Sequence, residues 1–533
     1  MSKKLKIEPK LKRLIYYIED LENGYIQIPS FQRDFIWDKK DKLDLFDSLK
    51  RGYPIGTILF WKPEKRDFGN MEKIGPYYSP EQKEGFFYIL DGFQRLSTIL
   101  GCLINPNKTK LKYDENDLKN NFLIYYDLEK EEFFIPRNIS ATENFQVPLY
   151  ILLDTFEFFK FSEKLAKYSN FRLLVDRATT LATKIVDFIL PSIEIVGGEL
   201  EEAVEIFSRI NSKGSTISSD WMLSALTYNQ DKEFRLGTII DDLIEDLSKF
   251  NFQDIKRDLI LQCIINSFGK AYFDQSGKIE ELAKRSDFIE KTKEVVESIK
   301  RAVEFLYEYL LVVEYKLLPY RNQLIFITDF FNSVQNPTDK QIEVLKKWFW
   351  ITTYSNYFTI YSLSKQREAY NVFQKFIKGE IDNPLYNDKP EIPFSVTDFP
   401  NKIFFGSVRA KALILFLLKY SNSKTDLKRY DIDGLGLGYL FGNRDDKGNF
   451  YTESVMPFIA IQNNKSFFKK YDLSKHLKKD SYKTDYELYF LNQEMVELFS
   501  QGKKLEILKI RKELIIKAEK EFVESLGMTY EIE

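Results

Sequence analysis

Short apolar runs alternate with helical patterns over the first hundred residues. The runs YIQIPS, GTILFWK and FFYIL predict strands at residues 25–30, 56–62 and 86–90, because β-branched and aromatic residues are concentrated there. Between the first two runs, apolar residues recur at helical spacing from Leu43, and Gly52 predicts the end of that helix. The start of the chain is therefore expected to mix helices and strands.

The pattern changes after residue 155. Before it, FLIYYDLEKEEFFIP at 122–136 predicts a hairpin with its turn in the charged middle. After it, long amphipathic patterns dominate and strands become rare until a glycine-rich stretch near residue 434, so we expect a helical middle. Prolines at 380–400 indicate a further boundary. We expect an α+β fold with three regions: residues 1–155, 156–385 and 400–533.

Composition limits where nucleic acid can bind. Of 533 residues, 78 are Lys or Arg and 80 are Asp or Glu, so a net charge of −2 gives no overall positive field that attracts DNA or membranes. Any DNA site must be local. Aromatic residues interleaved with basic ones, a pattern of single-strand binding, run along the whole chain, and we attribute them to a general compositional bias.

Cysteine usage and the lengths of apolar runs predict a cytoplasmic protein. Cys102 and Cys263 lie among apolar neighbours, and two cysteines cannot form a disulfide framework or a cysteine-rich zinc site. The longest uncharged apolar run, ALILFLL at 412–418, is too short to cross a bilayer. The N-terminal stretch MSKKLKIEPK is not followed by the apolar segment of a signal peptide.

The chain contains one histidine, His476. Chemistry that needs two histidines is therefore excluded, including HExxH zinc hydrolysis, Cys₂His₂ zinc binding and cleavage by a His-Asn-His nuclease. The lysine-rich surroundings DLSKHLKKD favour a solvent-facing helix position for His476.

The stretch YILDGFQRLS places polar residues at a strand-to-helix junction. Asp91 is the expected N-cap, and Gly92 allows a sharp turn into the helix. Gln94, Arg95 and Thr98 fall outside the predicted buried stripe. Free N–H groups at a helix N-terminus, with an arginine one turn in, favour a phosphate site. A capped helix with an incidental surface arginine is the alternative.

Two other stretches raise similar alternatives. In IPSFQRDFIW, the residues Gln32, Arg33 and Trp37 can bind phosphate and stack on a base, or Trp37 can simply anchor the next helix. In IFSRINSKGSTIS, Arg209 and Asn211 end a predicted helix, where polar side chains also commonly bind backbone carbonyls.

Taken together and in this order, the motifs resemble those of the DUF262 family of GmrSD-type restriction and phage-defence proteins. IPSFQRDFIW, GYPIGTILFW, YILDGFQRLSTIL and IFSRINSKGSTIS carry the resemblance, which covers about residues 10–230. It implies a ParB/sulfiredoxin-like N-terminal domain, with the motif at 207–214 in the helical region completing a nucleotide site. Members of the family act in bacterial defence and couple nucleotide binding and hydrolysis to DNA nicking or cleavage.

Carried over position by position, the resemblance implies that three arginines neutralise phosphate, that Trp37 stacks on a base, and that Asp91 positions Mg²⁺ or a water. Asp91 and Arg95 would be the catalytic residues. The full set expected at one site is Gln32, Arg33, Trp37, Asp91, Gln94, Arg95, Thr98, Arg209, Asn211 and Gly214. The chain departs from the family pattern at Phe93, where the signature has glutamine, and at Phe31, where tyrosine is usual. The change at Phe93 puts hydrolysis in doubt more than binding.

The C-terminal region resembles the flanks of a DUF1524 nuclease domain that has lost its histidines. RYDIDGLGLGYLFGNRDDKGNFY stands between these flanks. Its acidic residues can ligate Mg²⁺, but a plain glycine-rich hairpin explains the stretch better because the spacing fits no known metal loop. The acidic residues are Asp431, Asp433, Asp445 and Asp446.

The sequence thus predicts a cytoplasmic defence protein that binds and hydrolyses an NTP, with Mg²⁺ implied by the triphosphate, and that recognises or nicks DNA. A homo-oligomer or defence-system partner proteins would fit the same role. The alternative is a non-catalytic module that senses a nucleotide or DNA and signals to a separate effector.

Overall fold

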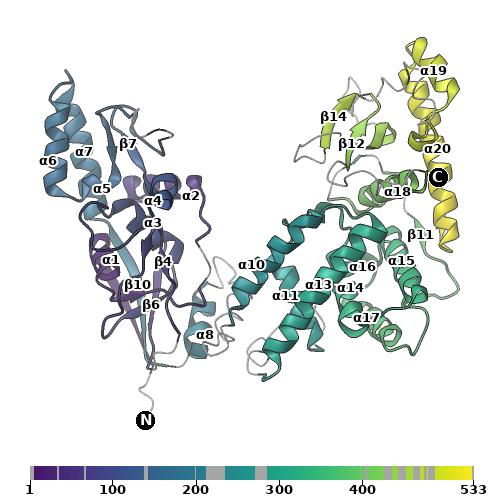
Figure 1. The fold of residues 1–533 in the computed structure, drawn as a ribbon, viewed down its shortest axis with the longest axis horizontal. Helices are drawn as coiled ribbons and strands as arrows, with labels where there is room; N and C mark the ends of the chain where they lie inside the picture. Colours follow the sequence, from purple (N-terminus) through teal and green to yellow (C-terminus); the bar gives the residue numbers. More distant parts are fainter. Residues whose placement is uncertain are drawn as a thin grey trace. The chain divides into compact units, whose positions relative to one another are not determined.

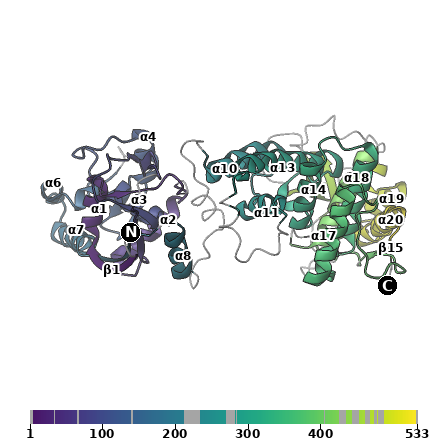
Figure 2. The same ribbon diagram turned by 90° about the horizontal axis from the view of Figure 1, so that it is seen from below.

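The computed structural model of the chain describes residues 5–32, 35–64, 68–136, 138, 142–198, 200–211, 234–269, 282, 285–396, 398–400, 402–403, 406–424, 435–441, 452–459, 468–472, 477 and 486–530. The chain forms two compact units. The first comprises Met1–Ile239 with Ile279–Lys284, and the second comprises Ile240–Lys278 with Arg285–Glu533. Each unit has its own set of packed elements (Figures 1 and 2).

The first unit is built on a five-stranded mixed sheet with the order β1-β10-β3-β6-β2. Its strands are β1 (Lys6–Arg13), β2 (Ile26–Gln27), β3 (Ile58–Lys62), β6 (Phe87–Asp91) and β10 (Ile189–Val196). β10 pairs antiparallel with β1 and parallel with β3, and β6 pairs antiparallel with β3 and parallel with β2. The strands predicted at 25–30, 56–62 and 86–90 are confirmed as β2, β3 and β6.

Helices cover both faces of this sheet. One face packs against α1 (Leu14–Glu22), α2 (Lys39–Arg51), α3 (Phe93–Leu103), α5 (Leu149–Leu152), α6 (Thr155–Leu165) and α7 (Phe171–Val186), which together bury the larger core. The other face packs against α8 (Leu200–Asn211) through Leu59, Trp61 and Ala203. Alternation of side chains along the strands explains the two cores, since Leu59 and Phe60 of β3 point to opposite faces.

Smaller sheets and short helices complete the first unit. The predicted hairpin at 122–136 is confirmed, because β7 (Tyr125–Asp127) pairs antiparallel with β8 (Glu132–Phe134). β9 (Gln146–Pro148) pairs on the other side of β7. The remaining elements are β4 (Lys73–Ile74), β5 (Tyr77–Tyr78), α4 (Glu115–Asp117) and the π-helical turn Leu118–Phe122.

Two strands of the main sheet were not expected. β1 is rich in charge and contains Pro9, and β10 contains Pro191, so neither reads as a typical strand. β1 is an edge strand, and the pairing of β10 with β3 begins only at Ser192. Each proline therefore sits where a missing N–H is tolerated. Because β10 follows residue 155, the N-terminal domain expected to end there does not contain the whole sheet, and the first unit runs further.

The second unit is mainly helical, as expected for the middle of the chain. Its longer helices are α10 (Leu236–Asp246), whose first four residues belong to the first unit, α11 (Arg257–Ser267), α13 (Phe288–Leu310), α14 (Arg321–Ser333), α15 (Asp339–Tyr354), α17 (Leu363–Ile377), α18 (Val408–Lys424), α19 (Gln493–Ser500) and α20 (Lys504–Ser525). Shorter elements are α16 (Tyr357–Ile360), β11 (Ser395–Val396), β12 (Leu435–Tyr439), β13 (Val455–Ile459), β14 (Phe468–Asp472), β15 (Thr529–Tyr530) and the 3₁₀ turns Leu247–Phe250, Tyr315–Leu317, Thr452–Ser454 and Glu487–Tyr489. Over the described ranges, no helix has the length and apolar character needed to span a membrane.

The boundary expected at 385–400 lies inside this second unit. The backbone N–H of Tyr386 donates to the Tyr357 hydroxyl at 3.0 Å, and β11 pairs in parallel with β15. Further along, the buried Arg409 of α18 binds Glu519 of α20 through two bonds of 2.7 Å. The Tyr354 and Tyr530 hydroxyls also donate to this carboxylate, at 3.0 and 2.9 Å. The residues on either side of the proline-rich segment thus share one set of contacts.

Candidate functional site

Asp91 and Arg95 meet where β6 leaves the sheet and α3 begins. Arg95 Nη2 donates to Asp91 Oδ2 at 3.0 Å, across one turn of the chain. The same guanidinium reaches the turn that precedes β3, where Nη1 donates to the Ile55 carbonyl at 2.7 Å and Nη2 to the Thr57 carbonyl at 3.1 Å. The two residues expected to be catalytic are therefore in direct contact at one edge of the sheet.

Arg95 is also a positioning residue for the turn that it contacts. Its side chain is 17% exposed, and its three bonds occupy three of the five N–H donors of a guanidinium. Gly56 lies between the two bonded carbonyls with φ of +89°, and a Cβ there would come within 2.4 Å of Arg95 Nη1. Glycine at this position lets the backbone close on the guanidinium. A phosphate at Arg95 would have two donors to bind.

The two glutamines join the first two motifs. Gln32 Nε2 donates to the Ile89 and Leu90 carbonyls of β6 at 3.1 and 3.2 Å. Gln94 Oε1 accepts from the backbone N–H groups of Ile36 and Trp37 at 2.9 and 3.3 Å. The segment before α2 is therefore held against the start of α3. Sequence reasoning expected these residues near one another, and the structure brings them together through backbone contacts.

Trp37 is half-buried and packs against the larger core of the first unit. This position corresponds to the anchoring alternative considered for it. Asp38, the next residue, caps α2 by accepting from the Asp41 N–H at 2.9 Å. Arg33, the phosphate ligand expected from the same motif, lies outside the described residues.

The third motif is described only in its first half. Arg209 lies on α8 with its side chain 79% exposed, and it forms an ion pair with Glu205 one turn earlier. Asn211 is the last residue of α8, but its side chain and Gly214 lie outside the described residues. α8 packs on the sheet that carries Asp91, through Ala203 and its neighbours. The third motif therefore shares a unit with the first two.

Two expectations about the start of α3 are wrong. The N-cap is Gly92, with φ of +96°, and Asp91 is still within β6, so its carboxylate pairs with Arg95 and does not cap the helix. Thr98 does not lie outside the buried stripe. Its side chain is fully buried, and Oγ1 donates to the Gln94 carbonyl at 2.9 Å. Thr98 therefore satisfies its hydroxyl within its own helix and offers no group to a ligand.

A cavity of about 640 Å³ borders the turn that Arg95 holds. Its walls include Ile55, Gly56 and Thr57 from that turn, together with Phe188 and with Ile189, the first residue of β10. This volume is typical of small-molecule sites. Sequence reasoning missed the second wall, although Phe188 and Ile189 are apolar residues where α7 gives way to β10. Arg51, Lys184 and Asp187 also line the cavity and bring charge to it.

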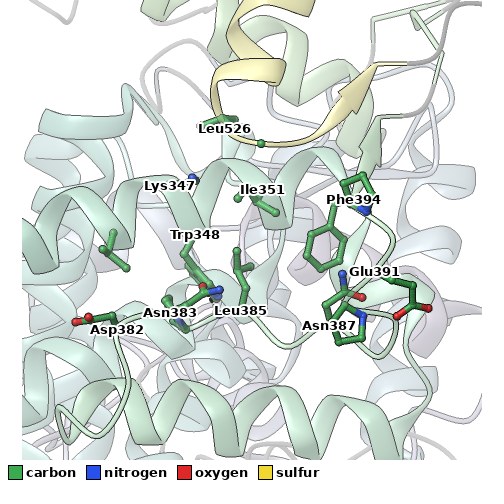
Figure 3. Close-up of a pocket in the computed structure, with 15 residues that line it drawn as sticks. Lys347, Trp348, Ile351, Asp382, Asn383, Leu385, Asn387, Glu391, Phe394 and Leu526 are labelled. Atoms are coloured by element: carbon green, nitrogen blue, oxygen red, sulfur yellow. Dashed lines mark hydrogen bonds between the residues drawn. The ribbon is translucent and has the colours of Figure 1, made fainter.

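A second cavity of about 680 Å³ lies within the second unit. Figure 3 shows Trp348 and Ile351 of α15 on one side, Asn383 and Leu385 on another, and Leu526 beyond the end of α20. Trp348 is buried, and its Nε1 has no hydrogen-bond partner among the described residues. None of the residues expected at the nucleotide site lines this cavity or the one beside the turn that Arg95 holds.

The acidic residues and the histidine considered in the C-terminal region are outside the described residues. These are Asp431, Asp433, Asp445, Asp446 and His476. Within the portion of the chain that the structure describes, no three His, Cys, Asp or Glu side chains gather closely enough to hold a metal ion.

Comparison with known proteins agrees with the motifs. Residues 15–228 match the family model of the GmrSD restriction endonuclease N-terminal domain, a range that runs from α1 through all three motifs. This match confirms the resemblance inferred for about residues 10–230. The chain is also 22% identical over 461 residues to an uncharacterised protein of Methanocaldococcus jannaschii, and the similarity covers 79% of this chain and 77% of that protein.

Proposed function

We propose that this chain, whose residues 15–228 match the GmrSD restriction endonuclease N-terminal domain, is a cytoplasmic protein of restriction-type defence against phage or foreign DNA. In this proposal it binds and hydrolyses an NTP in the first unit and couples this to recognition or nicking of DNA. One observation carries the nucleotide site: Gln94 and Arg95, which stand beside Asp91, bind two other motifs, and the turn that Arg95 binds at 55–57 borders a cavity of ligand size.

The residues of this edge fit a triphosphate. Among the described residues, no side chain caps the first turn of α3, so its backbone N–H groups can bind phosphate oxygens together with the remaining donors of Arg95. Asp91 accepts one bond from Arg95 through Oδ2, and its other oxygen can hold Mg²⁺ or orient a water. A single carboxylate suits Mg²⁺, which is commonly bound through substrate phosphates and water. Bound Mg²⁺ would neutralise charge on the phosphates during transfer.

Phosphate release by the purified full-length chain tests this proposal. The chain is incubated with Mg²⁺ and each of ATP, GTP, CTP and UTP, with and without DNA, and relaxation of supercoiled plasmid is followed in parallel. We expect Asp91→Asn and Arg95→Ala to abolish phosphate release. Glu115→Gln, which removes an exposed ion pair with Lys119, serves as the matched control. Absence of phosphate release with every NTP, or equal rates in all variants, would contradict hydrolysis at this site.

A second candidate function is a non-catalytic sensor of nucleotide or DNA. It is favoured by Phe93, which replaces a polar residue of the family signature and is 5% exposed, so it presents no polar group to a ligand. Calorimetry with each NTP separates the two functions, since a sensor binds its nucleotide without releasing phosphate.

A further inference from the structure

The helical pair α6 and α7 exposes large apolar side chains over a short stretch. Phe156 and Phe159 are 61% and 62% exposed, and Phe171 and Leu173 are 38% and 48% exposed. The two helices lie side by side in both views of the fold (Figures 1 and 2). A single exposed phenylalanine on a surface needs no explanation, but several in neighbouring positions are typical of an interaction site.

Basic side chains lie beside two of these rings, Phe156 and Phe171. Lys160 Nζ lies 4.2 Å from the centroid of the Phe156 ring, and Lys108 Nζ lies 5.6 Å from it. Residues 156–173 contain four basic and two acidic residues, a net charge of +2 within a chain whose net charge is −2. Lys108 and Lys160 pair with Asp154 and Glu157, respectively.

Other basic side chains of the α6–α7 helical pair are available to an anionic partner. Lys164, Lys167 and Arg172 form no ion pair with any residue that the structure describes, and all three are exposed. They lie at the end of α6 and the beginning of α7, next to Phe171. Positive charge and exposed rings therefore occur together on this region of the surface.

We infer that the α6–α7 pair binds single-stranded DNA, with Phe156 and Phe159 as stacking platforms and the neighbouring lysines as phosphate contacts. The choice of DNA as the partner rests on the function proposed above. Phe156 and Phe159 are three residues apart on one helix, so they share a face and are displaced by about 4.5 Å along its axis. Unpaired bases expose faces on which such rings stack, whereas a duplex hides them. The rings alternate with charges and form no continuous apolar stripe, which disfavours insertion into a lipid surface.

Fluorescence anisotropy of a labelled oligo(dT) of about 30 nucleotides, with full-length protein, tests the inference. We expect Phe156→Ala/Phe159→Ala to weaken binding by at least about tenfold, because each stacked base loses its ring. Lys164→Gln/Lys167→Gln should lower the salt dependence of binding. Tyr309→Ala is the matched control, since Tyr309 is also 55% exposed with Lys346 Nζ 5.7 Å from its ring, and it should bind like the wild type.

The outcomes separate this inference from the proposed function. Equal affinity of wild type and the double phenylalanine variant, in a protein that still binds an NTP, overturns the α6–α7 site alone. No DNA binding by the wild type overturns both the site and the DNA role. Stronger binding to anionic vesicles than to oligo(dT), with the same loss in the variant, also overturns the inference. If the double phenylalanine variant unfolds, the variant Phe159→Trp is used in its place. Tryptophan fluorescence that saturating oligo(dT) leaves unchanged would then count against stacking.

Discussion

Replacing Asp329 by asparagine should stabilise the second unit at neutral pH. Asp329 lies on α14 and is 8% exposed. It accepts hydrogen bonds from the Tyr370 hydroxyl at 3.0 Å and from Gln374 Nε2, both on α17. No cation pairs with it among the described residues. Burial raises its pKa from the ordinary 3.8 to about 6, because the charged carboxylate loses water and gains no counterion.

The sign and size of the effect follow from this pKa. A raised pKa means that the folded state favours the neutral carboxyl, so ionisation costs no stability below about pH 4 and its full cost is present above about pH 6. A difference of about 2 pKa units corresponds to about 3 kcal/mol at about pH 7.5, and to about half of that at about pH 5. Asp329→Asn keeps a neutral side chain of the same shape and should remove this cost.

Urea unfolding followed by hydrogen exchange mass spectrometry measures the effect, because peptides of α14 and α17 report on the second unit separately. The gain in the free energy of unfolding should rise between about pH 5 and about pH 7.5. Asp382→Asn, which removes an exposed ion pair with Lys340, is the control and should change stability by less than about 0.5 kcal/mol. A variant less stable than the wild type at neutral pH, or a gain that does not depend on pH, would refute the assigned cost of ionisation.

Two further substitutions test contacts of each unit. Gly56→Ala should destabilise the first unit by about 3 kcal/mol in urea unfolding, because the strain of a left-handed φ adds to the clash with Arg95. The control is Gly52→Ala, at a position with φ of +70° and open space around it, which should cost about 1 kcal/mol in the same assay. Similar losses at the two glycines would argue against a close contact with Arg95. In thermal unfolding, Glu519→Gln should lower stability by about 3 kcal/mol or more, because it leaves the buried guanidinium of Arg409 without its counterion. The control is Glu524→Gln, which removes an exposed partner of Lys520 at 3.8 Å and should change stability by less than about 0.5 kcal/mol. Equal losses at the two glutamates would count against a buried ion pair at Arg409.

Local patterns predicted the strands that coincide with short, continuous apolar runs, whose side chains are mostly buried. The strands at 56–62 and 86–90 and the hairpin at 122–136 were predictable because apolar runs and turn residues define them. β1 and β10 were not, since their strand character comes from pairing with each other and with β3, which lies far away in the sequence. Only tertiary contacts select the strand conformation there.

The proximity of the first two polar motifs was predictable, but the contacts of individual side chains were not. The motif order placed Gln32 and Trp37 near Gln94, and Gln32 and Gln94 bind backbone groups across the two motifs. Helical periodicity wrongly left Thr98 exposed, because α3 is buried from Leu96 to its end. The helical period of apolar residues predicts one buried stripe of α3. It cannot show that further segments, such as the one carrying Phe122, pack against the other faces of this helix.

The partner of β1 is synthesised long after β1 itself. Lys6 pairs opposite Val196 and Arg13 opposite Ile189, so about 180 residues must leave the ribosome before the first strand can be paired. At roughly 5–20 residues per second, this takes on the order of 10–40 s. During that interval an unpaired strand is a template for aggregation. The alternating charges and the proline of KIEPKLKR disfavour pairing with other chains. The charged, proline-containing composition that makes β1 hard to predict as a strand therefore also protects the nascent chain from aggregation until β10 has been synthesised.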